Sequence, residues 1–180
     1  LQPLGQKEKT QRQVNNILNN LKRLQRKLRG TDKMNIDTLR EELKIDEGYK
    51  ESIYLDHLGL RTFGVGHLVT RSDPEWEYGV GEPISEERCI DAFEEDVQIV
   101  LNDCKNVYVF FDDLPEEAQL IVANMMFNMG SPRMRKFLKF KVALSTHNWK
   151  EAAIEMEDSR WHKQVTNRAN RLIERMNNID

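Results

Sequence analysis

The sequence of 180 residues lacks any apolar run long enough to cross a membrane. A membrane-spanning helix needs about 20 consecutive, mostly apolar residues. No apolar segment follows Leu1 either, so no signal peptide is visible, although a chain without an initial methionine could have lost one. Hydrophobic residues make up 39% of the chain, which suffices for a packed core and argues against general disorder. We therefore expect a soluble, folded protein.

Cysteine is also scarce, because only Cys89 and Cys104 occur. Both fall in a stretch that is typical of one long helix, in which 15 residues correspond to about 22 Å. A disulfide joins Cα atoms that lie less than about 7 Å apart, so we expect two free thiols. A metal site needs more ligands than these two residues, and none cluster near them. We expect neither a metal ion nor another cofactor.

Charge is distributed unevenly along the chain. Residues 1–30 contain eight Lys or Arg and one Glu, a net charge of +7, so the other 150 residues must carry −10 to give the total of −3. The same segment has apolar residues every three or four positions, which predicts an amphipathic helix that ends at Gly30. Its apolar positions are Val14, Ile17, Leu21, Leu24 and Leu28.

This pattern predicts a basic helical extension over residues 1–33, followed by the main domain over residues 34–180. Two heptads are too few to decide between a self-associating coiled coil, a helix docked on a partner helix or on its own body, and a solvated connector. The basic face also suits an anionic surface. Its lack of aromatic residues argues against nucleic acid as a partner.

The main domain has the pattern of an α+β protein that is mostly helical. A helix from about Asp37 to Asp46, with Leu39, Leu43 and Ile45 as its apolar positions, precedes short β-forming runs that end near Val69. After a loop over residues 71–84, a helix from Ser85 to Cys104 carries an apolar stripe from Ile90 to Leu101. Further helices are expected at about 115–127, 135–145, 149–158 and 164–176, with a turn at 130–132 and an ambiguous segment at 107–111. We expect a small β-hairpin lobe and a helical lobe that the long helix joins, with a cleft between them.

Two carboxylates stand where the helical pattern breaks. Glu47 ends the first helix of the domain, where a negative charge is unfavourable, and Asp56 lies in the turn of the expected hairpin. Glycoside hydrolysis uses such a pair: a protonated acid for the leaving oxygen, and an ionised carboxylate for the water or the sugar cation. In a chain with 30 Asp and Glu, spacing alone leaves two solvated acids as the simpler interpretation.

The string from Asp46 to Leu68, DEGYKESIYLDHLGLRTFGVGHL, resembles the active-site segment of the phage-type lysozymes. The similarity continues in the same order at Asn124–Gly130 (NMMFNMG), Trp149–Ala153 (WKEAA) and Ser159–Arg171 (SRWHKQVTNRANR). The resemblance implies a lysozyme-like fold and a muramidase. Such an enzyme cleaves, with inversion, the β-1,4 bond between N-acetylmuramic acid and N-acetylglucosamine in peptidoglycan. It would act on the bacterial cell wall, after release from a host cytoplasm or as part of a virion.

The resemblance also implies roles for single residues. Glu47 corresponds to the general acid, Asp56 to the second carboxylate, and Thr62 to the hydroxyl that helps to position the attacking water. With inversion, the two carboxyl groups should stand about 6.5–9.5 Å apart. Five further positions are expected to support the site or to line it: His67 and Asp96 as an ion pair, Arg168 bonded to the catalytic acid, and Leu68 and Phe127 against the substrate.

Other functions remain open at this stage. A lytic transglycosylase needs one acid and leaves a 1,6-anhydro end. A glycan-binding or structural module would keep the fold without turnover, although intact Glu47, Asp56 and Thr62 argue against it. The basic extension alone could disrupt membranes. The chain also departs from the family pattern, because Asn128 replaces a glutamine and Leu58 replaces an acid beside Asp56.

Overall fold

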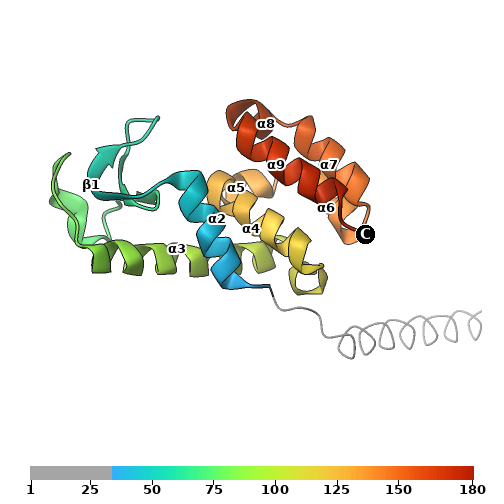
Figure 1. Ribbon diagram of the computed structural model, residues 1–180, viewed down its shortest axis with the longest axis horizontal. Coiled ribbons are helices and arrows are strands. Elements are labelled where there is room, and N and C mark those ends of the chain that lie inside the picture. The colour runs from blue at the N-terminus through green and yellow to red at the C-terminus, as the bar shows by residue number, and fades with distance from the viewer. Residues whose placement is uncertain (1–33) are drawn as a thin grey trace, which may run out of the picture. The chain divides into compact units, whose positions relative to one another are not determined.

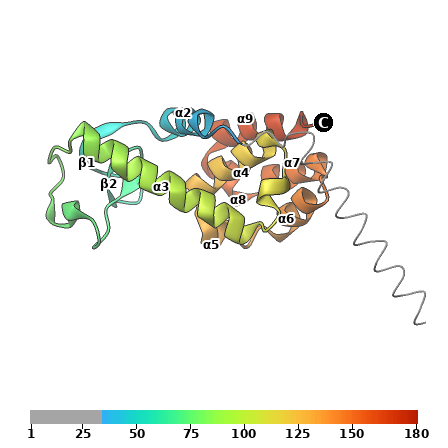
Figure 2. The same ribbon diagram turned by 90° about the horizontal axis from the view of Figure 1, so that it is seen from below.

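The computed structural model describes residues 34–180. The basic extension expected over residues 1–33 lies outside the described residues, so its helix, its boundary with the main domain and its docking stay predictions. Figures 1 and 2 show the described chain as a small β lobe and a larger helical lobe, and α3 (Glu86–Val107) runs from one to the other. The expected α+β fold with two lobes is therefore confirmed. None of the helices within residues 34–180 is long and apolar enough to cross a membrane.

The first described helix, α2 (Ile36–Glu47), is capped by a residue that the sequence analysis did not select. The side chain of Asn35 accepts hydrogen bonds from the backbone N–H groups of Asp37 and Thr38, so Asn35 is the N-cap and the helix begins one residue before the expected start at Asp37. The prediction of Ile45 as an apolar position was also wrong, since its side chain is 79% exposed. The helix ends at Gly48, whose φ of 75° directs the chain into the β lobe.

The β lobe is a three-stranded antiparallel sheet with the order β1 (Lys50–Leu55), β2 (Arg61–Gly64) and β3 (His67–Leu68). A short 3-10 helix, η1 (Pro74–Glu77), lies in the loop that follows. The lobe has its own small core, in which strand side chains pack on the N-terminal part of α3. Its buried members are Ile53, Phe63, Val69, Ile84, Cys89 and Ala92.

The joining helix α3 has 22 residues, which corresponds to about 33 Å. It starts where predicted, because the side chain of Ser85 accepts a hydrogen bond from the Arg88 N–H, and it ends at Val107, three residues later than expected. Its apolar stripe from Phe93 to Leu101 is buried, but Ile90 is 48% exposed. Both cysteines are buried free thiols, as predicted.

The helical lobe packs around α4 (Glu116–Met129), whose residues from Ala118 to Met126 are all buried. The other elements of the lobe are η2 (Phe111–Asp113), α5 (Ser131–Met134), α6 (Leu138–Ser145), α7 (Trp149–Glu157), α8 (Arg160–Gln164) and α9 (Thr166–Asn177). Three features differ from prediction: the expected turn at 130–132 opens the short helix α5, α6 begins at Leu138 rather than at residue 135, and the helix expected at 164–176 begins at Thr166, after the unpredicted short helix α8. Of the ambiguous residues 107–111, Val107 ends α3, residues 108–110 connect it to η2, and Phe111 begins η2.

Candidate active site

Glu47 lies at the last position of α2, and its carboxylate is only partly enclosed. The Arg168 Nη1 donates a hydrogen bond of 2.6 Å to Glu47 Oε1, and the Glu47 side chain is 21% exposed. Glu47 Oε2 lies on the side of Gly66, where a Cβ added to that glycine would be 3.6 Å away. Within residues 34–180, Oε2 has no hydrogen-bond partner, so it is available to a ligand.

Arg168 is buried at the junction of three helices. From α9, its Nε donates to Asn124 Oδ1 (2.8 Å) and its Nη2 donates to the Asn124 carbonyl oxygen (3.1 Å), both on α4. Its Nε also lies 3.4 Å from Asp46 Oδ2, which accepts a further bond of 2.9 Å from Asn124 Nδ2. Arg171, one turn later on α9, holds the same carboxylate with bonds of 2.6 and 2.8 Å. The contacts with Asn124 and Asp46 therefore fix the position of the Arg168 guanidinium that binds Glu47.

The contact of Arg168 with Glu47 was expected, but Asp46 and Asn124 were not predicted as further partners of Arg168, nor Arg171 as a second arginine on Asp46. A signal was present in the spacing of Arg168 and Arg171, because residues three apart share one face of a helix. Asn124 opens the NMMFNMG motif, yet nothing local marks its side chain as a partner of residues 44 and 78 positions away.

Asp56 occupies the hairpin turn between β1 and β2. Its Oδ1 accepts bonds of 2.8 Å from the backbone N–H groups of both Leu58 and Leu60, a side-chain arrangement that favours aspartate in turns. Gly59 completes the turn with a φ of 76°. Asp56 Oδ2 makes no hydrogen bond to any described residue, so the turn orients one oxygen and leaves the other open.

Thr62 lies on β2, paired with Tyr54 of β1 and Leu68 of β3. Its side chain is buried, and its hydroxyl donates a bond of 3.1 Å to the carbonyl oxygen of Leu60, the residue whose N–H holds Asp56. A hydroxyl that donates one bond retains lone pairs that can accept from a water molecule. Thr62 is thus joined to the turn that orients Asp56.

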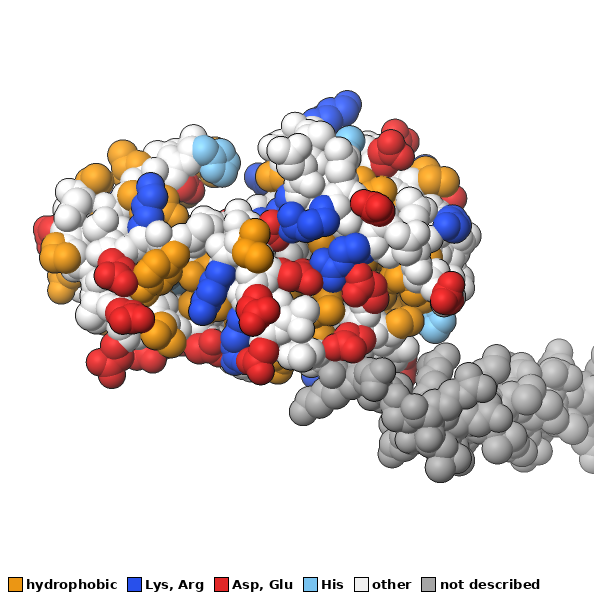
Figure 3. Space-filling view, viewed as in Figure 1, with side chains coloured by type: hydrophobic (Ala, Val, Ile, Leu, Met, Phe, Trp, Pro, Cys, Tyr) orange, Lys and Arg blue, Asp and Glu red, His pale blue; other side chains and the backbone are white. Residues whose placement is uncertain are grey.

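Figure 3 shows a hollow between the β lobe and the helical lobe. Of the two residues expected to contact substrate, Leu68 is 45% exposed, whereas Phe127 on α4 is half-buried and packs edge-on against Phe93 with ring centres 6.2 Å apart. The contact with Phe93 is one that a core residue would make. Within residues 34–180, no group of three or more His, Cys, Asp or Glu is arranged to hold a metal ion.

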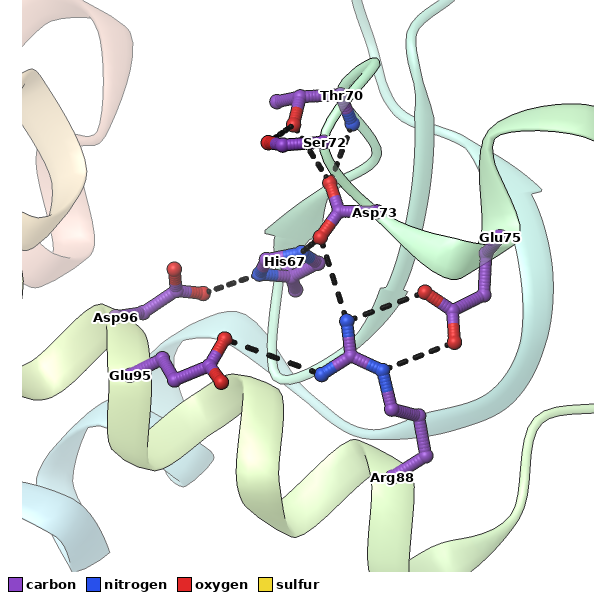
Figure 4. Close-up of polar contacts among 8 residues, drawn as sticks. All are labelled: His67, Thr70, Ser72, Asp73, Glu75, Arg88, Glu95 and Asp96. Carbon is purple, nitrogen blue, oxygen red and sulfur yellow. Dashed lines mark hydrogen bonds and ion pairs between the residues drawn. The ribbon is translucent and has the colours of Figure 1, made fainter.

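A second polar cluster surrounds His67 of β3, where the sheet faces α3 (Figure 4). The His67 ring contacts two carboxylates, with Nδ1 2.9 Å from Asp96 Oδ2 and Nε2 3.2 Å from Asp73 Oδ1. Arg88 continues the cluster from α3, bonded to Asp73 (3.3 Å) and through two nitrogens to Glu75 (2.9 and 3.1 Å). Asp96 was expected as the partner of His67, but Asp73, Glu75 and Arg88 were not predicted as members of the cluster.

The two carboxylates favour the charged form of His67. Burial alone would lower the pKa of His67, but the hydrogen bonds and charges of Asp96 and Asp73 outweigh burial and raise that pKa above 6.5. Burial would likewise raise the pKa of Asp73, yet hydrogen bonds from Thr70 and the His67 charge lower it overall. The raised pKa of His67 and the lowered pKa of Asp73 are the shifts expected of two oppositely charged groups that attract each other in the folded protein.

The two lobes and the arginine-bound carboxylate at the end of α2 define a protein with a lysozyme-like fold. A model of the phage lysozyme family matches residues 44–178, so the chain belongs to the phage lysozyme family and is a lysozyme-type enzyme.

Individual relatives agree with this assignment. The chain is 32% identical over 157 residues to a probable T4-type lysozyme 2 of Dictyostelium discoideum, covering 77% of this chain and 92% of that protein. A probable T4-type lysozyme 1 of the same organism is 31% identical over 162 residues, with the same coverage. The peptidoglycan hydrolase gp36 of Pseudomonas phage phiKMV is 26% identical over 147 residues, which are 82% of this chain and 16% of that longer protein.

Proposed function

We propose that this lysozyme hydrolyses the β-1,4 bond between N-acetylmuramic acid and N-acetylglucosamine in bacterial peptidoglycan, with inversion. The observation that carries the proposal is the state of Glu47, whose carboxylate has one oxygen bound by Arg168 and the other open. The similarity to a protein named as a peptidoglycan hydrolase supports the choice of substrate. The enzyme would act on the bacterial cell wall.

Glu47 is proposed as the general acid. Because Arg168 occupies Oε1, the transferable proton belongs on Oε2, the oxygen without a protein partner. When Glu47 gives this proton to the leaving glycosidic oxygen, the resulting carboxylate keeps its charge-assisted bond to Arg168, which stabilises it. Gly66 has no side chain that would narrow the approach to Oε2.

Asp56 and Thr62 are proposed to handle the attacking water. The two backbone amides hold Asp56 Oδ1, so Oδ2 is free to take a proton from the water and to oppose the positive charge that develops on the sugar. The Thr62 hydroxyl, which already donates to Leu60, would accept a hydrogen bond from the same water and fix its direction.

Two other functions are kept as alternatives. A lytic transglycosylase would use Glu47 alone, and the orientation of Asp56 by its turn favours hydrolysis over that reaction. A glycan-binding module without turnover would need neither the open oxygen of Glu47 nor a fixed Asp56. Leu68 stays a candidate for substrate contact, and Phe127 stays one beside its packing on Phe93.

The test is digestion of purified peptidoglycan by the intact protein and by the Glu47→Gln variant. We expect reducing N-acetylmuramic acid ends by mass spectrometry, and a rate that falls about 10²–10⁴-fold in the variant because the proton donor is lost. Glu51→Gln is the matched control, since Glu51 is an exposed acid whose side chain bonds only Tyr49 among residues 34–180. It should retain the wild-type rate.

Each rival has its own outcome in this experiment. Fragments that end in 1,6-anhydro sugars would show that the reaction is transglycosylation rather than hydrolysis. Binding to the wall with no released fragments would indicate the module without turnover. If killing of cells survived Glu47→Gln but not removal of residues 1–33, membrane disruption by the basic extension would be the better account. Proton NMR of the first product anomer tests inversion.

A further inference from the structure

The acidic main domain contains one region of opposite character. Residues 131–150 include six Lys or Arg and no Asp or Glu, although residues 34–180 together carry −10. The nearby helix α8 adds Arg160 and Lys163. Positive charge is thus concentrated on α5, α6 and α8 of the helical lobe.

Most arginines elsewhere in residues 34–180 have a partner. Arg40, Arg88, Arg168, Arg171 and Arg175 each form an ion pair with a carboxylate. Arg61 and Arg71 contact the ring of Trp76. In contrast, the side chains of Arg133, Arg135, Lys136, Arg160 and Lys163 have no hydrogen bond or ion pair to any residue in that part of the chain, and all five are exposed.

Three of these five cations converge on one cavity. A pocket of about 380 Å³ lies between α5 and α8, and Arg133, Lys136 and Arg160 line it. No acidic residue lines it; the other lining residues are Met129, Phe137, Ser159, Trp161 and Gln164. The volume lies within the range of pockets that bind small ligands.

The walls of the pocket strengthen the attraction of its cations for an anion. Trp161 is buried, and its indole N–H is already bonded to Asn128 Oδ1 at 2.9 Å, so the ring presents an apolar surface. Phe137 and Met129 are half-buried beside it. Charges beside a low-dielectric wall focus their field into the cavity. Such a lining favours an anion over a cation.

The set of donors favours phosphate over a single carboxylate. Two guanidinium groups present planar pairs of N–H donors that match phosphate oxygens, and Lys136 adds a third positive charge. A lone carboxylate carries one charge and two oxygens, which would leave one or more of these cations without a partner. A free or terminal phosphate carries up to two charges and three or more acceptor oxygens, and two neighbouring phosphodiesters of a polymer together supply two charges and four such oxygens.

We propose that the pocket between α5 and α8 is a binding site for a phosphate group, separate from the site of Glu47 and Asp56. The phosphate belongs either to a small free anion or to a phosphodiester polymer that contacts the same surface. The site does not depend on glycan cleavage, since none of its lining residues contacts Glu47 or Asp56.

The test is titration of the intact protein with inorganic pyrophosphate in phosphate-free buffer at low ionic strength, followed by calorimetry and phosphorus NMR. We expect saturable binding that weakens about tenfold or more in the double variant R133Q/R160Q. The matched control is R135Q/K163Q, which also removes two positive charges, but from exposed positions outside the pocket. Its affinity should fall less than about threefold, since it alters only the long-range field.

Two further titrations test whether the pocket prefers phosphate to carboxylate and whether the phosphate belongs to a free anion or to a polymer. Citrate, a tricarboxylate, should bind more weakly than pyrophosphate. A phosphodiester polymer such as poly(glycerol phosphate) that bound far more tightly per phosphate would identify a polymer as the ligand, and equal affinity would identify the free anion. The proposal is overturned if no saturable binding occurs, if both double variants lose affinity equally, or if citrate binds as well as pyrophosphate. Thermal unfolding of both variants checks that the fold is retained.

Discussion

Two polar clusters of this lysozyme both contain a helical arginine bound to two carboxylates, but they differ in whether every oxygen of those two carboxylates is hydrogen-bonded. Each has an arginine on a helix that holds carboxylates from a distant segment: Arg168 with Asp46 and Glu47, and Arg88 with Asp73 and Glu75. In the Arg88 cluster, both oxygens of Asp73 and of Glu75 are bonded. In the Arg168 cluster, Asp46 is saturated, but Glu47 Oε2 has no partner among residues 34–180.

This difference separates a structural cluster from a candidate catalytic one. Buried polar groups are normally satisfied, so an open carboxylate oxygen at the edge of a buried network is a feature that a ligand can use. The Arg88 cluster fixes the loop around η1 to α3, and both carboxylates that Arg88 itself binds at under 3.5 Å, Asp73 and Glu75, are fully bonded. The comparison predicts that damage to the first cluster abolishes activity, and that damage to the second reduces only stability.

The largest effect is expected for Arg168→Met. The substitution leaves Asp46 and Glu47 without their buried guanidinium, and removing one partner of a buried ion pair costs about 3–5 kcal/mol. Chemical denaturation should show this loss, and the rate per folded molecule should fall as well. Arg171→Met is the control, because the Arg171 side chain is 44% exposed and, among residues 34–180, forms hydrogen bonds and an ion pair with Asp46 only. A similar loss in both variants would contradict the central position of Arg168.

A smaller loss of stability is expected for Arg88→Met. It removes charge-assisted bonds to Glu75 and Asp73, each worth about 1.5–3 kcal/mol at most, from a side chain that is 21% exposed. The rate of peptidoglycan digestion per folded molecule should stay near that of the wild type. If the rate fell as far as in Arg168→Met, the two clusters would not differ in function as the comparison states.

The pH dependence of stability should reveal the His67 pair. Because the pKa of His67 is raised above 6.5, its contribution is present below about pH 6.5 and is lost as the pH rises through the raised value. Because the pKa of Asp73 lies below 3.8, its contribution is lost as the pH falls through that lowered value. The free energy of unfolding from this pair should therefore be largest between about pH 4 and 6.

His67→Asn isolates this contribution. The variant should lose about 1–3 kcal/mol near pH 5 and progressively less above pH 7, measured by urea unfolding across the pH range. His57→Asn, at an exposed position of the hairpin turn, should follow the wild-type curve. A loss in His67→Asn that stayed constant from pH 5 to 9 would show that packing, rather than charge, gives His67 its effect.

The smallest effect on stability is expected for alanine substitutions at two glycines, which should differ in activity. Gly66 (φ 73°) and Gly81 (φ 91°) both have backbone angles that cost an alanine about 1–2 kcal/mol. Only at Gly66 would the new methyl group approach Glu47 Oε2, at 3.6 Å; at Gly81 it would meet open space. Unfolding and digestion assays should show similar destabilisation of Gly66→Ala and Gly81→Ala, with activity reduced in the first alone. Equal activity would argue against Oε2 as the reactive oxygen.

Local patterns predicted the elements that carry the candidate site. The end of α2 at Gly48 and the turn around Asp56 follow from glycine conformation and from aspartate bonding to nearby amides. The same reasoning failed at residues 130–138, because Ser131 and Pro132 suit a turn as well as the first turn of a helix. It also failed for Ile45, whose exposure depends on how α2 is rotated against α4.

The partners within each cluster were harder to predict. Arg171 and Asp46 are separated by 125 positions, and Arg88 and Glu75 meet only because the loop of η1 folds back on α3. Such contacts depend on how elements pack, and no periodicity in one segment encodes them. The contacts of Arg168 with Glu47 and of His67 with Asp96 were expected from the resemblance to a family, which already contains that packing.

The bond between Arg168 and Glu47 also has a consequence for how the protein is made. It spans 121 positions of the chain, from the end of α2 to the last helix. During synthesis, the first lobe can emerge and begin to fold while α9 is still inside the ribosome. If Glu47 needs Arg168 to react, a nascent chain that still lacks α9 is inert, and activity begins only after α9 has been synthesised and has packed against α2.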